Sequence, residues 1–482
     1  MALFSRRRFK LSRLSAWFRT LLARWGYGWG YHLKLGDVHR LGDTKVRVPL
    51  DAGPIEITLG SGRKKLHLYQ ETQLNHKGET LSLKSFIVVD PFTNPGHIDG
   101  FLRLTPKNWL SLGKADAVQQ ALFRYPETVA DQHLALVHGG DAIVFRNLSE
   151  ADTGIGAAFR EMRWVPENRF RRLREIFGGP IDLLPNDQAL RLLEDVNRLL
   201  RQEEGRPVDD RGLPGGLLIV PDTLTPIVLA DMHARLDNLL TVLSQNAFLD
   251  ALEEGSAALI ILGDAVHSEV DGQLDEMASS MLMMDFIFRL KRRFPAHVFY
   301  LRGNHDSFSE NMVKSGVQQG RCWANALTER RGDVYRQAMD TFYQLLPYVV
   351  VAADFVACHA APPMGKVTRE MLVQLHRHPQ LQNELITNRS RRPERPHGYG
   401  RRDVKRFRRS LDLDKNLPFI VGHTPIDSEN TFWLNVDGME QHHVLYSAKP
   451  EQVGLFTRVG GVMIPLVYPV DSLQAIINRL TD

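Results

Sequence analysis

The sequence has few of the features that mark secreted or membrane-spanning proteins. Only two of its 482 residues are cysteines, Cys322 and Cys358, which are too few for a disulfide framework and are typical of a reducing compartment. No uninterrupted apolar run is long enough to cross a bilayer. The chain also has no internal repeat and no low-complexity tract. We therefore expect a soluble, globular, cytoplasmic protein.

The net charge of +4 is small, but the basic residues are clustered. The first 25 residues contain no Asp or Glu, and their apolar residues recur at helical spacing. Residues 1–33 therefore predict a basic amphipathic segment, which lies on an anionic membrane surface, packs on its own protein or forms a loose basic tail. Arg13, Arg19 and Arg24 interrupt the apolar region that a twin-arginine export signal requires, so we reject export.

Residues 34–159 contain short runs of β-favouring residues separated by Gly, Pro, Asn and Asp, as in a β-sandwich or barrel. We interpret this region as an accessory domain. The expected strands are 45–50, 55–59, 66–68, 81–89, 133–137 and 142–148.

Part of this region faintly resembles a forkhead-associated (FHA) sandwich. Leu112-Gly113-Lys114 stands for the family's Gly-Arg, residues 129–133 for its Ser-Arg-x-His, and Thr153-Gly154 for its Asn-Gly turn. Ala130 stands where the phosphothreonine-binding Ser of the family would be, and Asp131 where its Arg would be. We therefore favour an ordinary β accessory domain over a phosphothreonine-binding one.

A helical connector, residues 160–211, separates this region from the last domain, residues 212–482. Helices are expected over 161–177 and 187–202, the second with Asn186 or Asp187 as its cap. The turn-rich stretch 206–216 marks the domain boundary.

In the last domain, five apolar runs end in Asp, Asn or His. One polar strand end is often just a cap or a turn residue, but five in succession would be costly to bury without a common partner. Alternation in a strand places Asp231 and His233 on the same side. The runs are 225–230 before Asp231-Met232-His233, 257–262 before Gly263-Asp264, 297–301 before Arg302-Gly303-Asn304-His305-Asp306, 355–358 before His359, and 418–421 before Gly422-His423.

These residue types indicate a metal site. Carboxylate, imidazole and amide oxygen together suit Mn²⁺, Fe²⁺ or Zn²⁺ better than Mg²⁺ alone. Asp264 is placed to bridge two ions, and a two-metal site clamps the attacking and leaving oxygens when a phosphoryl group is transferred to water.

The same motifs resemble those of the calcineurin-like metallophosphoesterases, and within them the phosphoprotein phosphatase (PPP) family. The resemblance implies an α/β fold, a metallophosphoesterase β-sandwich flanked by helices, over residues 212–482. The segments that carry it are Asp231-Met232-His233, Gly263-Asp264-Ala265-Val266, Gly303-Asn304-His305-Asp306, residues 342–347, Cys358-His359-Ala360-Ala361-Pro362, Val421-Gly422-His423-Thr424-Pro425 and Tyr446-Ser447-Ala448.

The resemblance also implies the roles of individual residues. His305 would protonate the leaving oxygen after a hydroxide between two divalent ions attacks phosphorus, and Arg389 would hold the phosphate. One ion would be bound by Asp231, His233 and Asp264, and the other by Asp264, Asn304, His359 and His423.

The chain departs from the family at His267-Ser268-Glu269, where the family has Asp-Arg-Gly. The family Asp orients and charges the catalytic histidine, and its Arg grips the phosphate. His267 supplies no negative charge. Glu269 and Asp306 are both open as substitutes, because sequence spacing does not choose between them.

A dense cluster of basic residues follows Arg389. It is expected to place one or two arginines at the phosphate and the rest on a solvated rim, where they steer polyanionic substrates. Residues 403–410 are typical of a surface helix. Aromatic residues are sparse in the cluster, so we expect no specific nucleic-acid binding. Its members are Arg389, Arg391, Arg392, Arg395, Arg401, Arg402, Lys405, Arg406, Arg408 and Arg409.

Three functions are therefore open. The first is a dimetal phosphatase acting on phosphoserine or phosphothreonine in proteins. The second is a hydrolase of dinucleoside polyphosphates or other nucleotides, which shares the same ligands. The third is an inactive scaffold that binds phosphorylated partners, for which the replacement at His267-Ser268-Glu269 is the motive.

Overall fold

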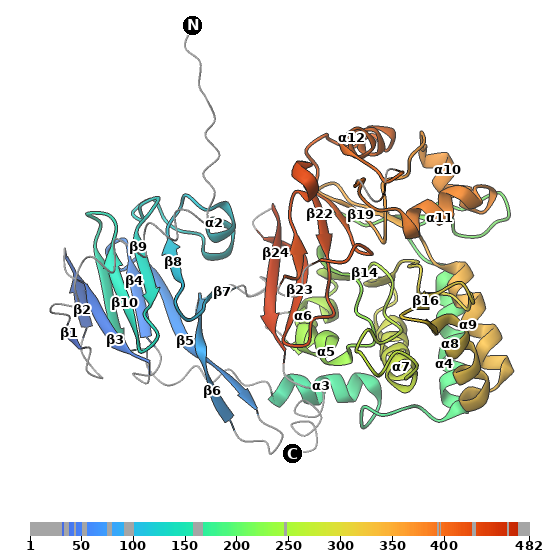
Figure 1. The fold of residues 1–482 in the computed structure, drawn as a ribbon, viewed down its shortest axis with the longest axis horizontal. Coiled ribbons are helices and arrows are strands. Elements are labelled where there is room, and N and C mark those ends of the chain that lie inside the picture. The colour runs from blue at the N-terminus through green and yellow to red at the C-terminus, as the bar shows by residue number, and fades with distance from the viewer. Residues whose placement is uncertain are drawn as a thin grey trace, which may run out of the picture. The chain divides into compact units, whose positions relative to one another are not determined.

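The computed structural model describes residues 31–32, 38–42, 45–50, 55–74, 80–90, 101–157, 167–244, 248–392, 395, 397–426, 430–459 and 462–470. The amphipathic segment predicted over residues 1–33 lies outside the described residues, apart from Tyr31–His32, which form β1, and it stays a prediction. None of the described helices is long and apolar enough to cross a membrane. The chain forms two units, described separately below (Figure 1): unit 1 is Met1–Glu71, Ser82–Pro91 and Leu102–Glu161, and unit 2 is Thr72–Leu81, Phe92–Phe101 and Met162–Asp482.

Unit 1 is a β-sandwich, one of the two architectures expected for it. Strand β4 shows why: Ile55, Ile57 and Leu59 alternate with less buried polar residues, so one face of the strand is apolar. Apolar side chains from both sheets form one core. One sheet has the order β1 (Tyr31–His32), β3 (Val46–Pro49), β10 (Ala142–Asn147), β9 (Leu134–His138), β8 (Trp109–Leu112), and the other β2 (Val38–Leu41), β11 (Thr153–Ala157), β4 (Ile55–Leu59), β5 (Lys64–Leu74), β6 (Thr80–Val89), β7 (Phe101–Leu104).

The sequence predicted some strands of unit 1 and missed others. All six expected segments overlap strands, namely β3, β4, β5, β6, β9 and β10, whereas β1, β2, β7, β8, β11 and the helix α2 (Ala117–Phe123) were not expected. The interpretation of Thr153-Gly154 as a turn was wrong, because both residues lie in β11 and pair with β2 and β4. The FHA resemblance that used this turn has no support in the structure.

The segment predicted as a helical connector contributes α3 (Glu167–Phe177) and α4 (Asn186–Arg201) to unit 2. Helix α4 buries Leu192, Leu193 and Val196 and packs against α7 (Ala278–Arg293) and α9 (Asp333–Leu345). The predicted cap at Asn186 or Asp187 was wrong. Pro185 occupies the cap position and makes no side-chain hydrogen bond there.

Two sheets form the centre of unit 2. Their facing sides share one apolar core, which includes Val228 and Ile260 from one sheet and Val350 and Ile420 from the other. One sheet has the order β12 (Leu217–Ile219), β18 (Val349–Val351), β19 (Val356–Cys358), β20 (Phe419–Val421), β22 (His442–Leu445), β21 (Phe432–Trp433), and the other β15 (Val298–Tyr300), β14 (Ala257–Ile261), β13 (Thr225–Leu229), β23 (Gln452–Val459), β24 (Val462–Pro469).

Helices cover the outer side of each sheet (Figure 1). Helices α5 (Leu236–Ser244), α6 (Phe248–Glu253) and α7 contact strands β23, β14 and β15 respectively. A second core joins the outer side of the other sheet to α10 (Arg369–Val373), η1 (Leu375–Arg377), α11 (Pro379–Thr387) and α12 (Arg401–Ser410). The predicted architecture, an α/β fold with a β-sandwich flanked by helices and preceded by a smaller β-rich region, is therefore confirmed.

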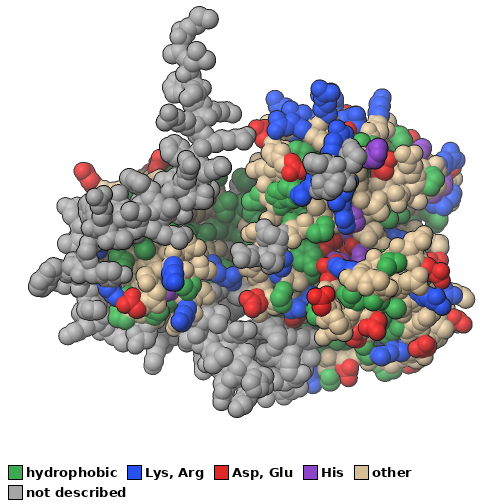
Figure 2. Space-filling model, viewed as in Figure 1, with side chains coloured by type: hydrophobic (Ala, Val, Ile, Leu, Met, Phe, Trp, Pro, Cys, Tyr) green, Lys and Arg blue, Asp and Glu red, His purple; other side chains and the backbone are tan. Residues whose placement is uncertain are grey.

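The remaining elements of unit 2 lie between these layers or at their edges. On the face shown in Figure 2, Lys and Arg side chains gather over the end of the unit that carries α12. The elements not yet named are α8 (Gln319–Arg331), the hairpin of β16 (Val313–Lys314) and β17 (Val317–Gln318), and η2 (Val436–Gly438).

Candidate metal centre

Five strands of unit 2 deliver the polar residues that the sequence singled out. The parallel strands β13, β14 and β15 are followed by Asp231, Asp264 and Asn304. In the other sheet, the parallel strands β19 and β20 are followed by His359 and His423. Because the carboxyl ends of parallel strands meet at the same edge of a sheet, the two sets come together at one end of the sandwich.

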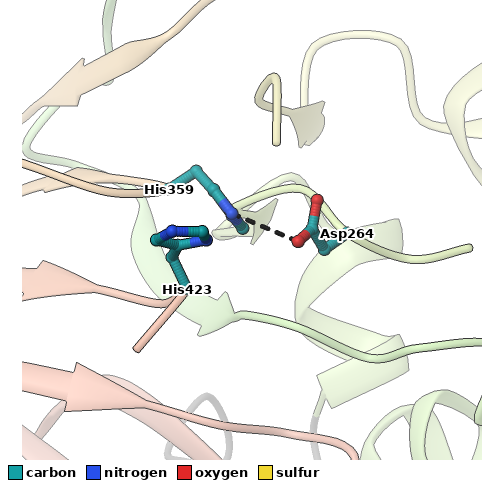
Figure 3. Close-up of side chains that lie close together, drawn as sticks. All are labelled: Asp264, His359 and His423. Atoms are coloured by element: carbon teal, nitrogen blue, oxygen red, sulfur yellow. Dashed lines mark ion pairs between the residues drawn. The ribbon is translucent and has the colours of Figure 1, made fainter. Parts of the chain in front are cut away.

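Two groups of possible metal ligands lie side by side there. In the first, ligand atoms of Asp231, His233 and Asp264 all lie within 4.8 Å of one another. In the second, the same holds for Asp264, His359 and His423 (Figure 3). The Asp264 carboxylate belongs to both groups and lies 3.2 Å from Nε2 of His359. One buried carboxylate thus joins two donor sets.

Asn304 completes the second group. Its Oδ1 lies 2.9 Å from Nε2 of His359, the nitrogen that also faces Asp264. The structure therefore brings together all six side chains that the sequence predicted as metal ligands.

Each of the three histidines has one ring nitrogen at a backbone carbonyl. Nδ1 of His233 lies 3.2 Å from the carbonyl oxygen of His267, and Nδ1 of His359 lies 2.9 Å from that of Leu262. For His423 it is Nε2, at 3.1 Å from the carbonyl of Thr387. A carbonyl accepts a hydrogen bond from the N–H that faces it, so in the neutral imidazole the other ring nitrogen keeps its lone pair. This arrangement suits imidazoles that bind a metal.

The backbone at the site is strained. Asp231, Asp264 and His423 have φ values of 49°, 53° and 61°, and His233 and His267 are also in the left-handed region. For residues with a Cβ this conformation costs about 1–3 kcal/mol each, and it persists only where the surroundings enforce it. The strain turns each side chain back toward the strand ends.

Two glycines make this close packing possible. A Cβ at Gly303 would lie 2.1 Å from Oδ1 of Asp264, and a Cβ at Gly422 would lie 2.6 Å from Oδ2 of Asp231. Gly422 follows β20 and Asp231 follows β13, so the ends of the two sheets are in close contact at this carboxylate.

Burial and the neighbouring charges shift the pKa values of Asp231 and His359. Burial raises the pKa of Asp231 to about 7. Burial alone would lower the pKa of His359, but the carboxylates of Asp264 and Asp231 raise it to about 9. The cluster therefore attracts positive charge into a buried site, as a divalent cation would provide.

The predicted acid, His305, is paired with another histidine. Its Nδ1 lies 3.1 Å from Nδ1 of His267, whose side chain is fully buried and packs against Trp323. One of the two nitrogens donates a hydrogen bond and the other accepts it, so His267 fixes the orientation of the His305 ring without adding negative charge. Burial lowers the pKa of His305 to about 4.

Neither of the acidic residues considered as substitutes has a hydrogen bond to His305 among the described residues. Asp306 accepts hydrogen bonds from the hydroxyl of Tyr300, at 2.7 Å, and from the backbone N–H groups of Gly303 and Asp264. It holds the loop rather than the histidine. Glu269 points toward the other side of the site.

Glu269 belongs to a small group that the sequence did not reveal. Its carboxylate is bonded by Lys314 and by the hydroxyl of Tyr446, and Oε1 lies 3.4 Å from Nε2 of His233. These contacts, with burial opposing them, lower the pKa of Glu269 to about 2. Lys314 comes from the short β16–β17 hairpin, and a single lysine in a polar turn carries no signal of this position.

Arg389 lies near the opposite side of the carboxylates. It follows α11, is half buried, and its Nε has no hydrogen-bond partner among the described residues. Its charge interacts with those of Asp231, Asp264 and Glu269. The position predicted for a phosphate-binding arginine is therefore occupied by a cation with unused donors.

Comparisons with known proteins agree with this geometry. Residues 224–449 match the family model described as calcineurin-like phosphoesterase. No curated protein matches the chain.

Among solved structures, the chain is similar to a serine/threonine phosphatase from Saccharomyces cerevisiae that is itself similar to human phosphatase PP5. The identity is 16% and the TM-score 0.44, over 60% of this chain and 91% of that one. It is also similar to a cold-active protein-tyrosine phosphatase from a psychrophilic Shewanella, with 11% identity and a TM-score of 0.34, over 83% of this chain and 98% of that one.

Proposed function

We propose that this protein is a dimetal phosphatase for phosphoserine and phosphothreonine in proteins. The match of residues 224–449 to the calcineurin-like phosphoesterase family model supports a phosphoric ester hydrolase. The observation that carries the proposal is the Asp264 carboxylate, which is shared by two groups of buried ligands. A site of this kind suits hydrolysis of a phosphomonoester, since two ions can hold both oxygens of an in-line displacement.

The residues fit two divalent ions. Oδ1 of Asp231 is buried and has no hydrogen-bond partner among the described residues, which leaves a lone pair for an ion. We assign one ion to Asp231, His233 and Asp264, and the other to Asp264, Asn304, His359 and His423. Mixed nitrogen and oxygen ligands favour Mn²⁺, Fe²⁺ or Zn²⁺. When bound, the ions would supply Lewis-acid activation of water and phosphate.

The chain's own residues would do the rest. Arg389 would donate two hydrogen bonds to phosphate oxygens, a contact that its planar guanidinium group makes well. His305 would hold a proton at Nε2 for the leaving oxygen, with its ring fixed through Nδ1 by His267. The family's phosphate-gripping Arg is replaced by Ser268, so Arg389 carries more of the binding in this chain.

We propose phosphoproteins as the substrates and a cytoplasmic location, as the sequence predicted. Binding of the N-terminal segment to an anionic membrane stays a separate prediction, because residues 1–30 lie outside the described part of the chain.

The test compares three substrates with added Mn²⁺: p-nitrophenyl phosphate, a phosphothreonine peptide and diadenosine tetraphosphate. Wild type is compared with Asp264→Asn, and with Asp340→Asn on the exposed side of α9 as a control for the lost charge. We expect the peptide to be hydrolysed by wild type and control, and the Asp264 variant to lose activity and bound metal.

Other results would change the assignment. Selective hydrolysis of the dinucleotide would make the protein a nucleotide hydrolase. If the wild type binds metal and phosphate but hydrolyses nothing, the enzyme proposal fails and a phosphate-binding scaffold takes its place.

A further inference from the structure

The outer face of α12 carries three cations whose side chains have no partner among the described residues. Arg402, Lys405 and Arg409 are exposed, and their spacing of three and four residues puts them on one side of the helix. The side chains of all three lack an ion pair or hydrogen bond to any described residue. Figure 2 shows the Lys and Arg side chains gathered at this end of unit 2.

This arrangement is electrostatically unfavourable for an isolated helix. Like charges three or four residues apart on a helix repel each other by about 0.2–0.5 kcal/mol per pair. Arg402 also lies in the first turn, where the partial positive charge of the helix end disfavours cations. An anion on this face would remove both penalties.

The other three cations of the helix have hydrogen-bond partners. The guanidinium group of Arg401 donates to the carbonyl of Gly438 at 2.9 Å. Arg406 pairs with Asp403 and also contacts the carbonyl of Met364. Arg408 is buried, and its guanidinium group donates to backbone carbonyls, at 2.6 Å in the shortest case, to Gln441. The uncompensated charge is therefore confined to the outer face, while the inner face, with Val404 and Phe407, packs into the core.

A short loop links this face to the phosphate-binding side of the candidate site. Arg389 lies at one end of the loop, and α12 begins at Arg401. The backbone N–H of Tyr399 donates to the carbonyl of Arg389 at 2.9 Å, and that of Arg391 donates to Tyr399 at 2.8 Å. These bonds bring the two ends of the loop together. The exposed side chains of Arg391 and Arg392 lie between the site and the helix in the chain.

We infer that the α12 face formed by Arg402, Lys405 and Arg409, with Arg391 and Arg392, binds acidic groups that flank the phosphorylated residue of a protein substrate. The inference rests on the proposed phosphatase function and adds a preference to it. Carboxylates or further phosphates on an extended peptide would contact this face while the scissile phosphate lies beside Arg389. Steering by such a face can raise association rates by about 10- to 1,000-fold.

A peptide fits this face better than a nucleic acid does. Binding of single strands relies on exposed aromatic side chains between the cations. Here Tyr399 and Phe407 are buried, and the ring of Trp433 has the Arg392 guanidinium group over it at 5.1 Å.

The test uses two phosphothreonine peptides that differ only in their flanking residues, aspartates in one and serines in the other. The variant Arg402→Gln/Lys405→Gln/Arg409→Gln is compared with Arg293→Gln/Arg321→Gln/Arg330→Gln, which removes the same charge from exposed positions of α7 and α8. The quantity measured is the ratio of kcat/KM for the acidic peptide to kcat/KM for the neutral one. This ratio does not depend on how much of a variant is folded.

We expect wild type and control to prefer the acidic peptide by about tenfold or more, and the α12 variant to lose the preference. Salt at about 0.5 M should remove it as well, because the charges are exposed. An equal preference in the α12 variant and the control would overturn the inference. So would an oligothymidylate that inhibits wild type more strongly than it inhibits the α12 variant, since the bound anion would then be a nucleic acid.

A binding experiment separates this inference from the proposed function. If no phosphopeptide is hydrolysed, fluorescence anisotropy of the labelled acidic peptide still measures its affinity for the face. Tighter binding by wild type than by the α12 variant would support the inference and leave only the enzymatic proposal refuted. Equal binding would refute both.

Discussion

The close approach of the two sheets at Gly422 gives a sharp test of the site. In Gly422→Ala, the new Cβ would lie 2.6 Å from Oδ2 of Asp231 and 3.0 Å from the Cβ of Ala230. Gly422 does not have a positive φ, so the alanine backbone itself is unstrained. The carboxylate of Asp231 has to turn away, and it loses its hydrogen bond from the N–H of His423.

The expected magnitude follows from that contact. Overpacking of one methyl group in a rigid core costs about 1–3 kcal/mol, which lowers the Tm of a domain of this size by about 2–4 °C for each kcal/mol. Moving a ligand by about 1 Å costs about 100-fold in rate or in metal affinity. We therefore expect a modest loss of stability and a large loss of metal binding and phosphatase activity.

The assay measures bound metal after dialysis, hydrolysis of p-nitrophenyl phosphate and the Tm. Gly365→Ala is the matched control, because Gly365 is exposed, has no positive φ and has no atom within 4 Å of an added Cβ. The reasoning is refuted if Gly422→Ala keeps the metal content and activity of Gly365→Ala.

Three further results are expected. Arg389→Gln should lower kcat/KM by about 10- to 100-fold, the value of a hydrogen-bonded contact to a charged group of about 1.5–3 kcal/mol, whereas an unchanged value would show that another cation holds the phosphate. His267→Asp should raise the pKa of His305 above its value of about 4. It should then speed hydrolysis of a phosphothreonine peptide more than that of p-nitrophenyl phosphate, because the leaving group of p-nitrophenyl phosphate needs no proton. Equal changes in rate for the two substrates would contradict this. Burial lowers the pKa of His442 to about 3, so below pH 6.5 the unfolded chain binds a proton that the native chain does not. As the pH falls below 6.5, the free energy of unfolding should then fall by about 1.4 kcal/mol per pH unit. Urea titrations at several pH values should show that the free energy of unfolding depends less on pH in His442→Gln.

The sequence predicted the candidate site better than it predicted the surrounding structure. Asp231, Asp264 and His359 were found because an apolar strand with a polar end is a local pattern, and parallel strands bring such ends together. The role of Asp306 could not be found in this way. It depends on a side-chain direction, which turns the carboxylate toward Tyr300 and away from His305.

The misses in unit 1 have a similar cause. Strand β11 contains Gly154 and Gly156, and such a glycine-rich segment is typical of a turn. It is a strand because β2 and β4 pair with it on both sides.

Helix α4 was predicted within a residue or two, but not its cap, because Pro185 also starts a helix well by its fixed φ.

The two groups of ligands differ in the sheets that supply them, and this difference affects the stability of the folded domain. Asp231, His233 and Asp264 all follow strands of one sheet, whereas the second group takes Asp264 and Asn304 from that sheet and His359 and His423 from the other. An ion in the second group would link the two sheets of unit 2, because it would have ligands from both. An ion in the first group would have ligands from one sheet only. Under the proposed assignment, removal of the two ions would have unequal effects. Loss of the ion in the first group would abolish activity, whereas loss of the ion in the second group would also remove a link between the two sheets.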